Sequence, residues 1–174
     1  FKFNTNHVLL KKRNKFEEKY FTLKNYKKKF SNLFVPNINS KKTIERIKKY
    51  KPQIIIVFGT SILKKEIINL CKKIQLINLH GGDPQKYRGL DSHLWCLYHQ
   101  DFSSLVTTLH YIDKGIDTGD IIETINISRQ SIKNFNNLRI NNVENCIYLF
   151  LNFYKKFIGK QKINRKKQLK KGRY

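Results

Sequence analysis

The stretch "QIIIVFGTSILKKEIINLCKKIQLINL", residues 53–79, decides the fold. It opens on "IIIVF", an apolar run of strand length that is typical of a central parallel strand covered on both faces. "SILKKEIINLCKK" then has the spacing of an amphipathic helix, with Ile62, Ile67, Leu70 and Cys71 predicted to face inward. "IQLINL" follows as a second strand. This order predicts an α/β fold with a doubly wound, mostly parallel sheet.

The sequence on either side continues the alternation of helices and strands. Upstream, Ser40 can cap a helix that carries Ile44, Ile47 and Tyr50 on one face, and Pro52 ends that helix. Downstream, "SHLWCLYHQ" is predicted to be helical, and "LVTTLHYID" and "DIIETINI" are predicted strands joined by "KGIDTG". A last helix is expected within residues 130–158.

Composition limits the class of protein. The chain has 174 residues, of which 40% are hydrophobic, and this predicts one globular domain. No apolar run reaches the length of a membrane span, so no membrane association is expected. Cys71, Cys96 and Cys146 are odd in number and widely spaced, which fits neither a disulfide framework nor a zinc motif. Free thiols are typical of a reducing cytoplasm, which is the expected location.

The formal net charge of +24 raises the question of a nucleic-acid partner. The lysines are spread from Lys2 to Lys171 instead of forming one stripe, so nucleic-acid binding is not expected. A positive field favours an anionic substrate such as a nucleotide. Residues 159–174, "GKQKINRKKQLKKGRY", contain almost no core-forming residues and are predicted to be a solvated basic tail behind a catalytic domain of residues 1–158.

The candidate chemistry lies in the loop that leaves the second strand and in a later turn. Asn78 and His80 are two residues apart on an extended segment, so they face the same way. Asp117 lies in "GIDTGD". A carboxamide beside an imidazole can stabilise an oxyanion or pass a proton, and a nearby carboxylate would raise the imidazole pKa and keep the ring cationic. No Ser or Cys is placed as a nucleophile, so acyl transfer would take its nucleophile from the substrate.

Each of these residues also has a structural interpretation. Asn78 and His80 can complete a hydrogen-bonded turn, and Asp117 is a common turn residue. A metal site formed by His80, Asp83 and Asp117 is a further alternative, although no His or Cys pair has ligand spacing.

Two separated motifs resemble those of one enzyme family. "NLHGGDPQKYRG", residues 78–89, and "TTLHYIDKGIDTGDII", residues 107–122, resemble the signature of the folate-dependent formyltransferases. That family includes methionyl-tRNA, glycinamide ribonucleotide and sugar N-formyltransferases. The resemblance implies a Rossmann-like fold with Asn78, His80 and Asp117 as catalytic residues. It also implies that Asn78 and a protonated His80 hold the oxyanion after the substrate amine attacks the formyl carbon.

The resemblance further implies a donor and an acceptor. The donor would be 10-formyltetrahydrofolate, held by Gly59, Ser61, Ile62, Leu63, Asp113, Gly115 and Ile116. The loop "GGDPQKYRGLDSHLW" is closer to the enzymes that formylate nucleotide-linked amino sugars for surface polysaccharide. The expected acceptor is therefore a dTDP- or GDP-linked 4-amino-4,6-dideoxysugar, contacted by Gly82, Tyr87, Arg88 and Asp91. Arg88 could instead brace the loop by satisfying its carbonyl groups.

Other functions stay open at this point. Activity on methionyl-tRNA or glycinamide ribonucleotide is one alternative, and a non-catalytic basic protein that binds nucleotides or nucleic acid is another. The family's fold begins with a strand–helix–strand unit, but "FKFNTNHVLL" contains no apolar opening strand. The chain is therefore expected to lack the first βα unit, and a second copy in a homodimer or another partner would cover the exposed strand edge.

Overall fold

A computed structural model describes residues 33–128, 130, 132 and 134–173. The chain divides into two units, residues 1–34 and 35–174, and every helix and strand described below lies in the second unit. The prediction that the first βα unit is missing falls on residues 1–32, which lie outside the described part of the chain.

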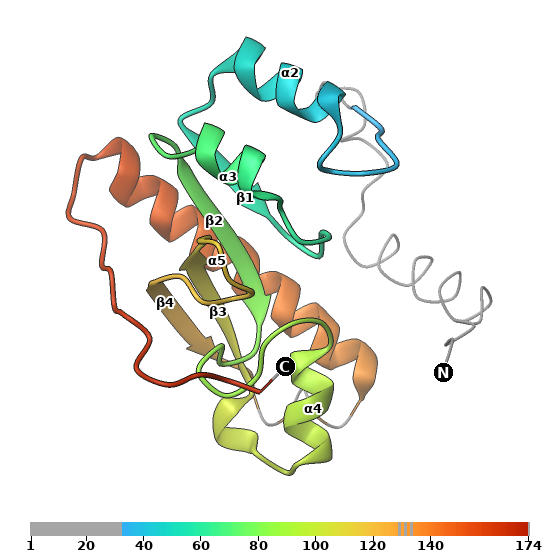
Figure 1. The fold of residues 1–174 in the computed structure, drawn as a ribbon. Helices are drawn as coiled ribbons and strands as arrows, with labels where there is room; N and C mark the ends of the chain where they lie inside the picture. Colours follow the sequence, from blue (N-terminus) through green and yellow to red (C-terminus); the bar gives the residue numbers. More distant parts are fainter. Residues whose placement is uncertain (1–32, 129, 131, 133, 174) are drawn as a thin grey trace. The chain divides into compact units, whose positions relative to one another are not determined.

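The described strands form one four-stranded sheet in the order β1 (Ile54–Val57), β2 (Gln75–Gly81), β3 (Val106–Tyr111) and β4 (Ile121–Asn126), as Figure 1 shows. The β1–β2 pair is parallel, whereas the β2–β3 and β3–β4 pairs are antiparallel. The predicted α/β class is confirmed, but this part of the sheet is mixed instead of mostly parallel. A short loop connects β3 to β4, and a direct connection of this kind reverses the strand direction.

Helices lie on both faces of the sheet (Figure 1). They are α2 (Lys41–Tyr50), α3 (Lys65–Leu70), α4 (Ser92–Tyr98) and α5 (Phe135–Ile158). As predicted, the Ser40 hydroxyl caps α2 by accepting a hydrogen bond from the Thr43 backbone N–H at 3.4 Å. No helix in the described residues is both long enough and apolar enough to cross a membrane.

Strand alternation sorts the core residues onto the two faces. Ile77 and Leu109 are fully buried and pack in the core on the α5 side, together with Leu149 and Phe153 of that helix. Leu76, one residue before Ile77, belongs instead to the core formed with α2 and α3. Asn78 and His80 have the same parity as Leu76, so both face the same side of the sheet, as predicted, and this side is the one away from α5.

The predicted helix after β1 begins later than expected. α3 starts at Lys65, and Ile62 is 61% exposed in the preceding loop. The Asn39 side chain holds this loop extended, because its carbonyl accepts from the Lys64 backbone N–H at 2.7 Å and its amide donates to the Ile62 carbonyl at 3.0 Å. Ile62 was therefore wrongly assigned to the inward face of a helix.

The prediction that β1 is covered on both faces is wrong at Ile56, and the described residues do not test its prediction as a central strand. Among these residues β1 pairs only with β2 and forms the outer strand of the sheet. Ile56 is 39% exposed, so one face of β1 is incompletely covered. The apolar composition of a strand shows that its side chains are suited to burial. Its position in the sheet depends on the strands with which it pairs, which can be far away in the sequence.

The C-terminal segment, residues 159–173, is mostly exposed but is anchored to the sheet instead of being free in solvent. The Ile121 and Lys166 backbones exchange two hydrogen bonds of 2.8 Å along the outer edge of β4. Ile163 packs against the core on the α5 side, and the Arg165 guanidinium lies 3.9 Å from the centre of the Tyr111 ring. In Figure 1 the segment continues from the end of α5 past β4 to the loop before α4.

Candidate active site

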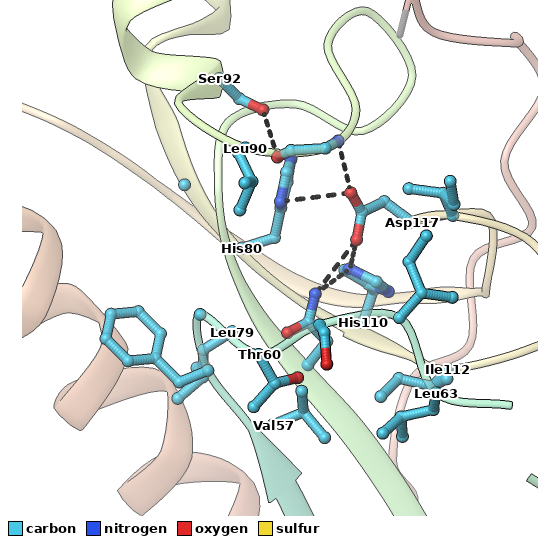
Figure 2. Close-up of a pocket in the computed structure, with 18 of the residues that line it drawn as sticks. Val57, Thr60, Leu63, Leu79, His80, Leu90, Ser92, His110, Ile112 and Asp117 are labelled. Atoms are coloured by element: carbon cyan, nitrogen blue, oxygen red, sulfur yellow. Dashed lines mark hydrogen bonds and ion pairs between the residues drawn. The ribbon is translucent and has the colours of Figure 1, made fainter. Parts of the chain in front are cut away.

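The sheet brings together polar side chains that are far apart in the sequence. Asn78 and His80 lie at the carboxyl end of β2 and face the same side. His110 lies directly opposite Asn78 in the antiparallel β2–β3 pair. Asp117 lies in the loop between β3 and β4 and points back toward these residues (Figure 2). The three predicted catalytic residues therefore meet at one place.

Asp117 is the centre of this cluster (Figure 2). Its Oδ2 accepts a 2.7 Å hydrogen bond from the Gly89 backbone N–H and lies 3.6 Å from His80 Nδ1. Its Oδ1 accepts from Asn78 Nδ2 at 3.1 Å and lies 3.5 Å from His110 Nε2. The carboxylate thus contacts groups from β2, β3 and the loop before α4.

These contacts determine the charge of Asp117. Burial alone would raise the pKa of the carboxyl group, but the adjacent imidazole rings of His110 and His80 and the hydrogen bond from the Gly89 N–H together lower that pKa to about 2. Asp117 is therefore ionised throughout the physiological range, in a position where its side chain is only 12% exposed.

His80 differs from the sequence-based prediction of a cationic ring. Its Nε2 lies 3.2 Å from the Tyr87 carbonyl, and its side chain is 6% exposed. Burial lowers the pKa of His80 below its usual value of 6.5 and outweighs the opposing effect of Asp117. Because the Tyr87 carbonyl accepts from Nε2, the neutral ring has its lone pair on Nδ1, which faces Asp117. His80 is thus prepared to accept a proton and form an imidazolium that Asp117 would stabilise.

His110 has a place in the cluster that the sequence analysis missed. Its Nδ1 donates a 2.7 Å hydrogen bond to the Tyr111 carbonyl, so in the neutral ring Nε2 accepts from Asn78 Nδ2 at 3.1 Å. The Asn78 amide therefore donates one hydrogen to His110 and the other to Asp117. The alternation of the "TTLHY" strand could have placed His110 on the polar face, but its pairing with Asn78 depends on the register.

The cluster opens into a cavity of about 840 Å³, a size that accommodates a cofactor-sized molecule. The predicted catalytic residues all line this cavity. The residues predicted to hold the donor line it as well: Gly59, Ser61, Ile62, Leu63, Asp113, Gly115 and Ile116. Apolar side chains, among them Val57, Leu79, Leu90 and Ile112, form much of the wall (Figure 2). This mixture of apolar walls and a few clustered polar groups is typical of a small-molecule site.

The residues predicted to contact the acceptor are divided between the cavity and its supporting layer. Asp91 lines the cavity, whereas Gly82, Tyr87 and Arg88 do not. The Tyr87 carbonyl contacts His80, and the Arg88 Nε donates to the Pro84 carbonyl at 2.9 Å. Gly82 has a φ of +147°, and a Cβ there would lie 2.7 Å from Ser92 Cβ, so this position needs glycine. This contact is the one expected if Arg88 braces the loop, which was the alternative to its contact with the acceptor.

The described residues contain no group of three or more His, Cys, Asp or Glu side chains that could hold a metal ion. Asp83, which the metal alternative required, accepts a hydrogen bond from the Gln85 backbone N–H and forms a local turn. The cysteines are also accounted for, because Cys71, Cys96 and Cys146 are buried free thiols.

Comparison with known proteins identifies the family to which this chain is similar. A family model described as formyl transferase matches residues 5–149. Over 84 residues the chain is 40% identical to a methionyl-tRNA formyltransferase of Clostridioides difficile (strain 630), a match that covers 47% of this chain and 26% of that protein. The chain thus spans about a quarter of the length of this curated relative.

Solved structures share the fold. The formyltransferase PseJ from Anoxybacillus kamchatkensis was solved with UDP-4,6-dideoxy-4-formamido-L-AltNAc and tetrahydrofolate. It is 28% identical, with a TM-score of 0.58 over 70% of this chain and 63% of its own. A 4-N formyltransferase from Francisella tularensis is 20% identical, with a TM-score of 0.65 over 90% of this chain and 60% of its own, and supports the fold alone. The formyltransferase fold predicted from the sequence is confirmed.

Proposed function

The chain belongs to the formyl transferase family, and we propose that its cavity transfers a formyl group from 10-formyltetrahydrofolate to a primary amine. The single observation that carries this proposal is the convergence of Asn78, His80 and Asp117 on one cluster at the cavity wall. Asn78 and His80 lie on β2, whereas Asp117 lies in the loop between β3 and β4, so only the folding of the chain brings the two motifs together.

The cavity fits the donor in size and in the character of its wall. 10-Formyltetrahydrofolate, the donor used by this family, would supply the formyl carbon that the acceptor amine attacks. The loop after β1, residues 59–63, and the loop after β3, residues 113–117, would hold it, because both loops line the cavity. Backbone groups of these loops can hydrogen-bond a polar ring system while the apolar wall contacts its faces.

The residues of the cluster can manage the proton and the charge of such a transfer. His80 Nδ1 would accept the proton that the attacking amine loses, because burial keeps the free ring neutral, and would return it to N10 of tetrahydrofolate as the bond between N10 and the formyl carbon breaks. The Asp117 carboxylate stabilises the resulting imidazolium at Nδ1. The Asn78 amide can donate a hydrogen bond to negative charge on the formyl oxygen, and to do so it must share a hydrogen that it now donates to His110 or Asp117.

For the acceptor, we propose the amine of a nucleotide-linked 4-amino-4,6-dideoxysugar. The similarity to PseJ supports this class, since that protein was solved with a UDP-linked 4-formamido sugar. The positive charge of the chain also suits an anionic nucleotide. Asp91 lines the cavity and is therefore the residue proposed to contact the acceptor directly.

Methionyl-tRNA is a second candidate acceptor, favoured by the 40% identity to the methionyl-tRNA formyltransferase of C. difficile. The two acceptors differ in their response to salt. Binding of a polyanion such as tRNA weakens steeply as salt displaces its phosphate contacts, whereas a nucleotide sugar has too few charges for that slope.

The test is the consumption of 10-formyltetrahydrofolate in the presence of a panel of amines: UDP-, dTDP- and GDP-linked 4-amino sugars, glycinamide ribonucleotide and methionyl-tRNA. Amine-dependent turnover that is lost in His80→Ala and kept in His99→Ala, a change of an exposed histidine, supports the proposal. Formate release without any amine would identify a hydrolase instead. A folded protein that consumes no donor with any amine would contradict the proposal.

A further inference from the structure

The C-terminal segment reaches the active-site cluster through one side chain, Gln168. Its Nε2 donates a hydrogen bond of 2.8 Å to the Asp117 carbonyl and another of 2.8 Å to the Gly119 carbonyl. Its Oε1 accepts a hydrogen bond of 3.0 Å from Arg88. The reverse orientation of the amide would place its oxygen against two carbonyl groups, so the surrounding network fixes the direction of Gln168.

Gln168 therefore joins the two loops that build the cluster. One loop contains Asp117, and the other contains Gly89, whose N–H binds the Asp117 carboxylate at 2.7 Å. Arg88, the residue before Gly89, is the partner of Gln168 on that second loop. The chain thus closes a ring of contacts in which Asp117 is held at its side chain by one loop and at its carbonyl by Gln168.

The backbone of Asp117 needs such support. Its φ is +51°, in the left-handed region that a residue with a side chain adopts at a cost of about 1 kcal/mol or more. A rotation of this peptide would move the carboxylate away from His80 and Asn78. Next to it, a Cβ at Gly119 would lie 1.9 Å from the Tyr111 carbonyl, which shows how closely this turn packs on β3.

Other contacts hold the C-terminal segment in position for this role. The Arg88 N–H donates to the Arg173 carbonyl at 2.8 Å, and the Arg173 N–H donates to the Lys86 carbonyl at 2.7 Å. The Leu169 N–H donates to Gln85 Oε1 at 2.9 Å. Gln168 thus lies between the two-bond contact of Lys166 with β4 and a second backbone contact at the end of the described chain.

We propose that Gln168 is a positioning residue, which orients the Asp117 carboxylate toward His80 and Asn78 by holding the Asp117 and Gly119 carbonyls. Its effect on catalysis rests on the proposed formyl transfer, but its effect on the geometry of the free protein does not. The C-terminal segment is then part of the active site's support, although it contributes no residue to the cavity wall.

A purely structural role for Gln168 makes different predictions. If the side chain only attaches the C-terminal segment, its contact with Arg88 matters most, and Gln168→Glu keeps that contact as an ion pair. The same change replaces the N–H donor with a second carboxylate oxygen, which would face the Asp117 and Gly119 carbonyls. Gln168→Glu therefore separates attachment of the segment from orientation of Asp117.

The first arm of the experiment uses the full chain without any ligand. Gln168→Met has nearly the same length, is uncharged and cannot donate, and Leu169→Ala, at a side chain that is 83% exposed, is the matched control. NMR titration measures the pKa of His80 and of Asp117 in each protein. The titratable groups that act on the His80 ring are Asp117, His110, Asp83 and His93.

Displacement of Asp117 has a defined signature in this titration. The pKa of Asp117 should rise from about 2 toward its ordinary value of 3.8, and the pKa of His80 should fall further, because His80 loses the anion that favours its charged form. Leu169→Ala should leave both values unchanged. A folded Gln168→Met protein with the wild-type values would overturn the proposal.

The second arm measures turnover with the amine that is active in the wild-type protein. Gln168→Glu should remain folded and retain the KM for the amine, while kcat falls about 10- to 100-fold, because a small displacement of a catalytic group has an effect of this size. Wild-type turnover in Gln168→Glu would contradict the proposal, even if Gln168→Met fails to fold. If the wild-type protein transfers no formyl group, the proposed function fails, while the ligand-free titration still decides the role of Gln168.

Discussion

Replacement of Asp117 by Asn tests the electrostatics of the cluster most directly. The pKa of Asp117 is about 2 in the folded protein and its ordinary value is 3.8. The difference is just under two units, and at 1.36 kcal/mol per unit it corresponds to about 2 kcal/mol of stability at neutral pH. Because the side chain is only 12% exposed, solvent screening reduces this value little.

The sign of the pH dependence follows from the direction of this shift. The folded protein binds the Asp117 proton more weakly than the unfolded chain does. The stabilisation is therefore complete above about pH 4 and is lost as the pH falls through about 2. Asp117→Asn removes the titrating group, so the difference in unfolding free energy between wild type and variant should narrow over this interval.

The assay is urea unfolding followed by circular dichroism at a series of pH values between 2 and 7. Glu45→Gln is the matched control, since it removes one negative charge from an exposed position on α2. Asp117→Asn should be about 2 kcal/mol less stable than this control at neutral pH and should approach it in acid. Parallel curves for Asp117→Asn and wild type over the whole range would refute the assignment of Asp117 as a buried, stabilised carboxylate.

Other changes test the fold around the cluster. Gly119→Ala places a Cβ 1.9 Å from the Tyr111 carbonyl and should destabilise the protein by about 3 kcal/mol or more, seen as a lower unfolding temperature; near-wild-type stability would contradict this packing. Phe153→Ala empties a site that is 1% exposed and should cost about 3–5 kcal/mol, whereas Tyr148→Ala, at a side chain 61% exposed on the same helix, should change the unfolding free energy by less than about 0.5 kcal/mol. His93 should titrate near 4 in an NMR experiment, because burial lowers its pKa to about 4, and its acid-side signal should disappear in His93→Gln; titration near 6.5 would show that the ring is solvated.

The apolar spacing of the sequence predicted the elements that depend on local chemistry. "IIIVF" and "IQLINL" form neighbouring parallel strands, and Ser40 caps the helix that precedes them. Alternation along β2 was sufficient to place Asn78 and His80 on one face, because successive side chains of a strand point to opposite sides. The motifs also indicated the family, which the matched family model shows.

Features that depend on long-range pairing could not be predicted in this way. The antiparallel register places His110 beside Asn78, and no property of either local segment specifies that register. The pKa of His80 depends on how deeply the folded protein buries the ring. The sequence shows that Asp117 can raise this pKa, but it does not show that burial lowers the pKa by more. The position of β1 at the outer side of the described sheet likewise follows from its pairing partners.

The sequence by itself determined which side chains can perform acyl transfer and which strand face presents two of them. Only the tertiary structure decided how those side chains are oriented and charged. The C-terminal segment shows the difference most clearly, because its basic composition predicted a solvated tail, whereas Gln168 contacts both active-site loops. Composition describes the average preference of a segment for water, but a single amide with two carbonyl partners and one guanidinium partner is positioned by contacts that only the folded chain provides.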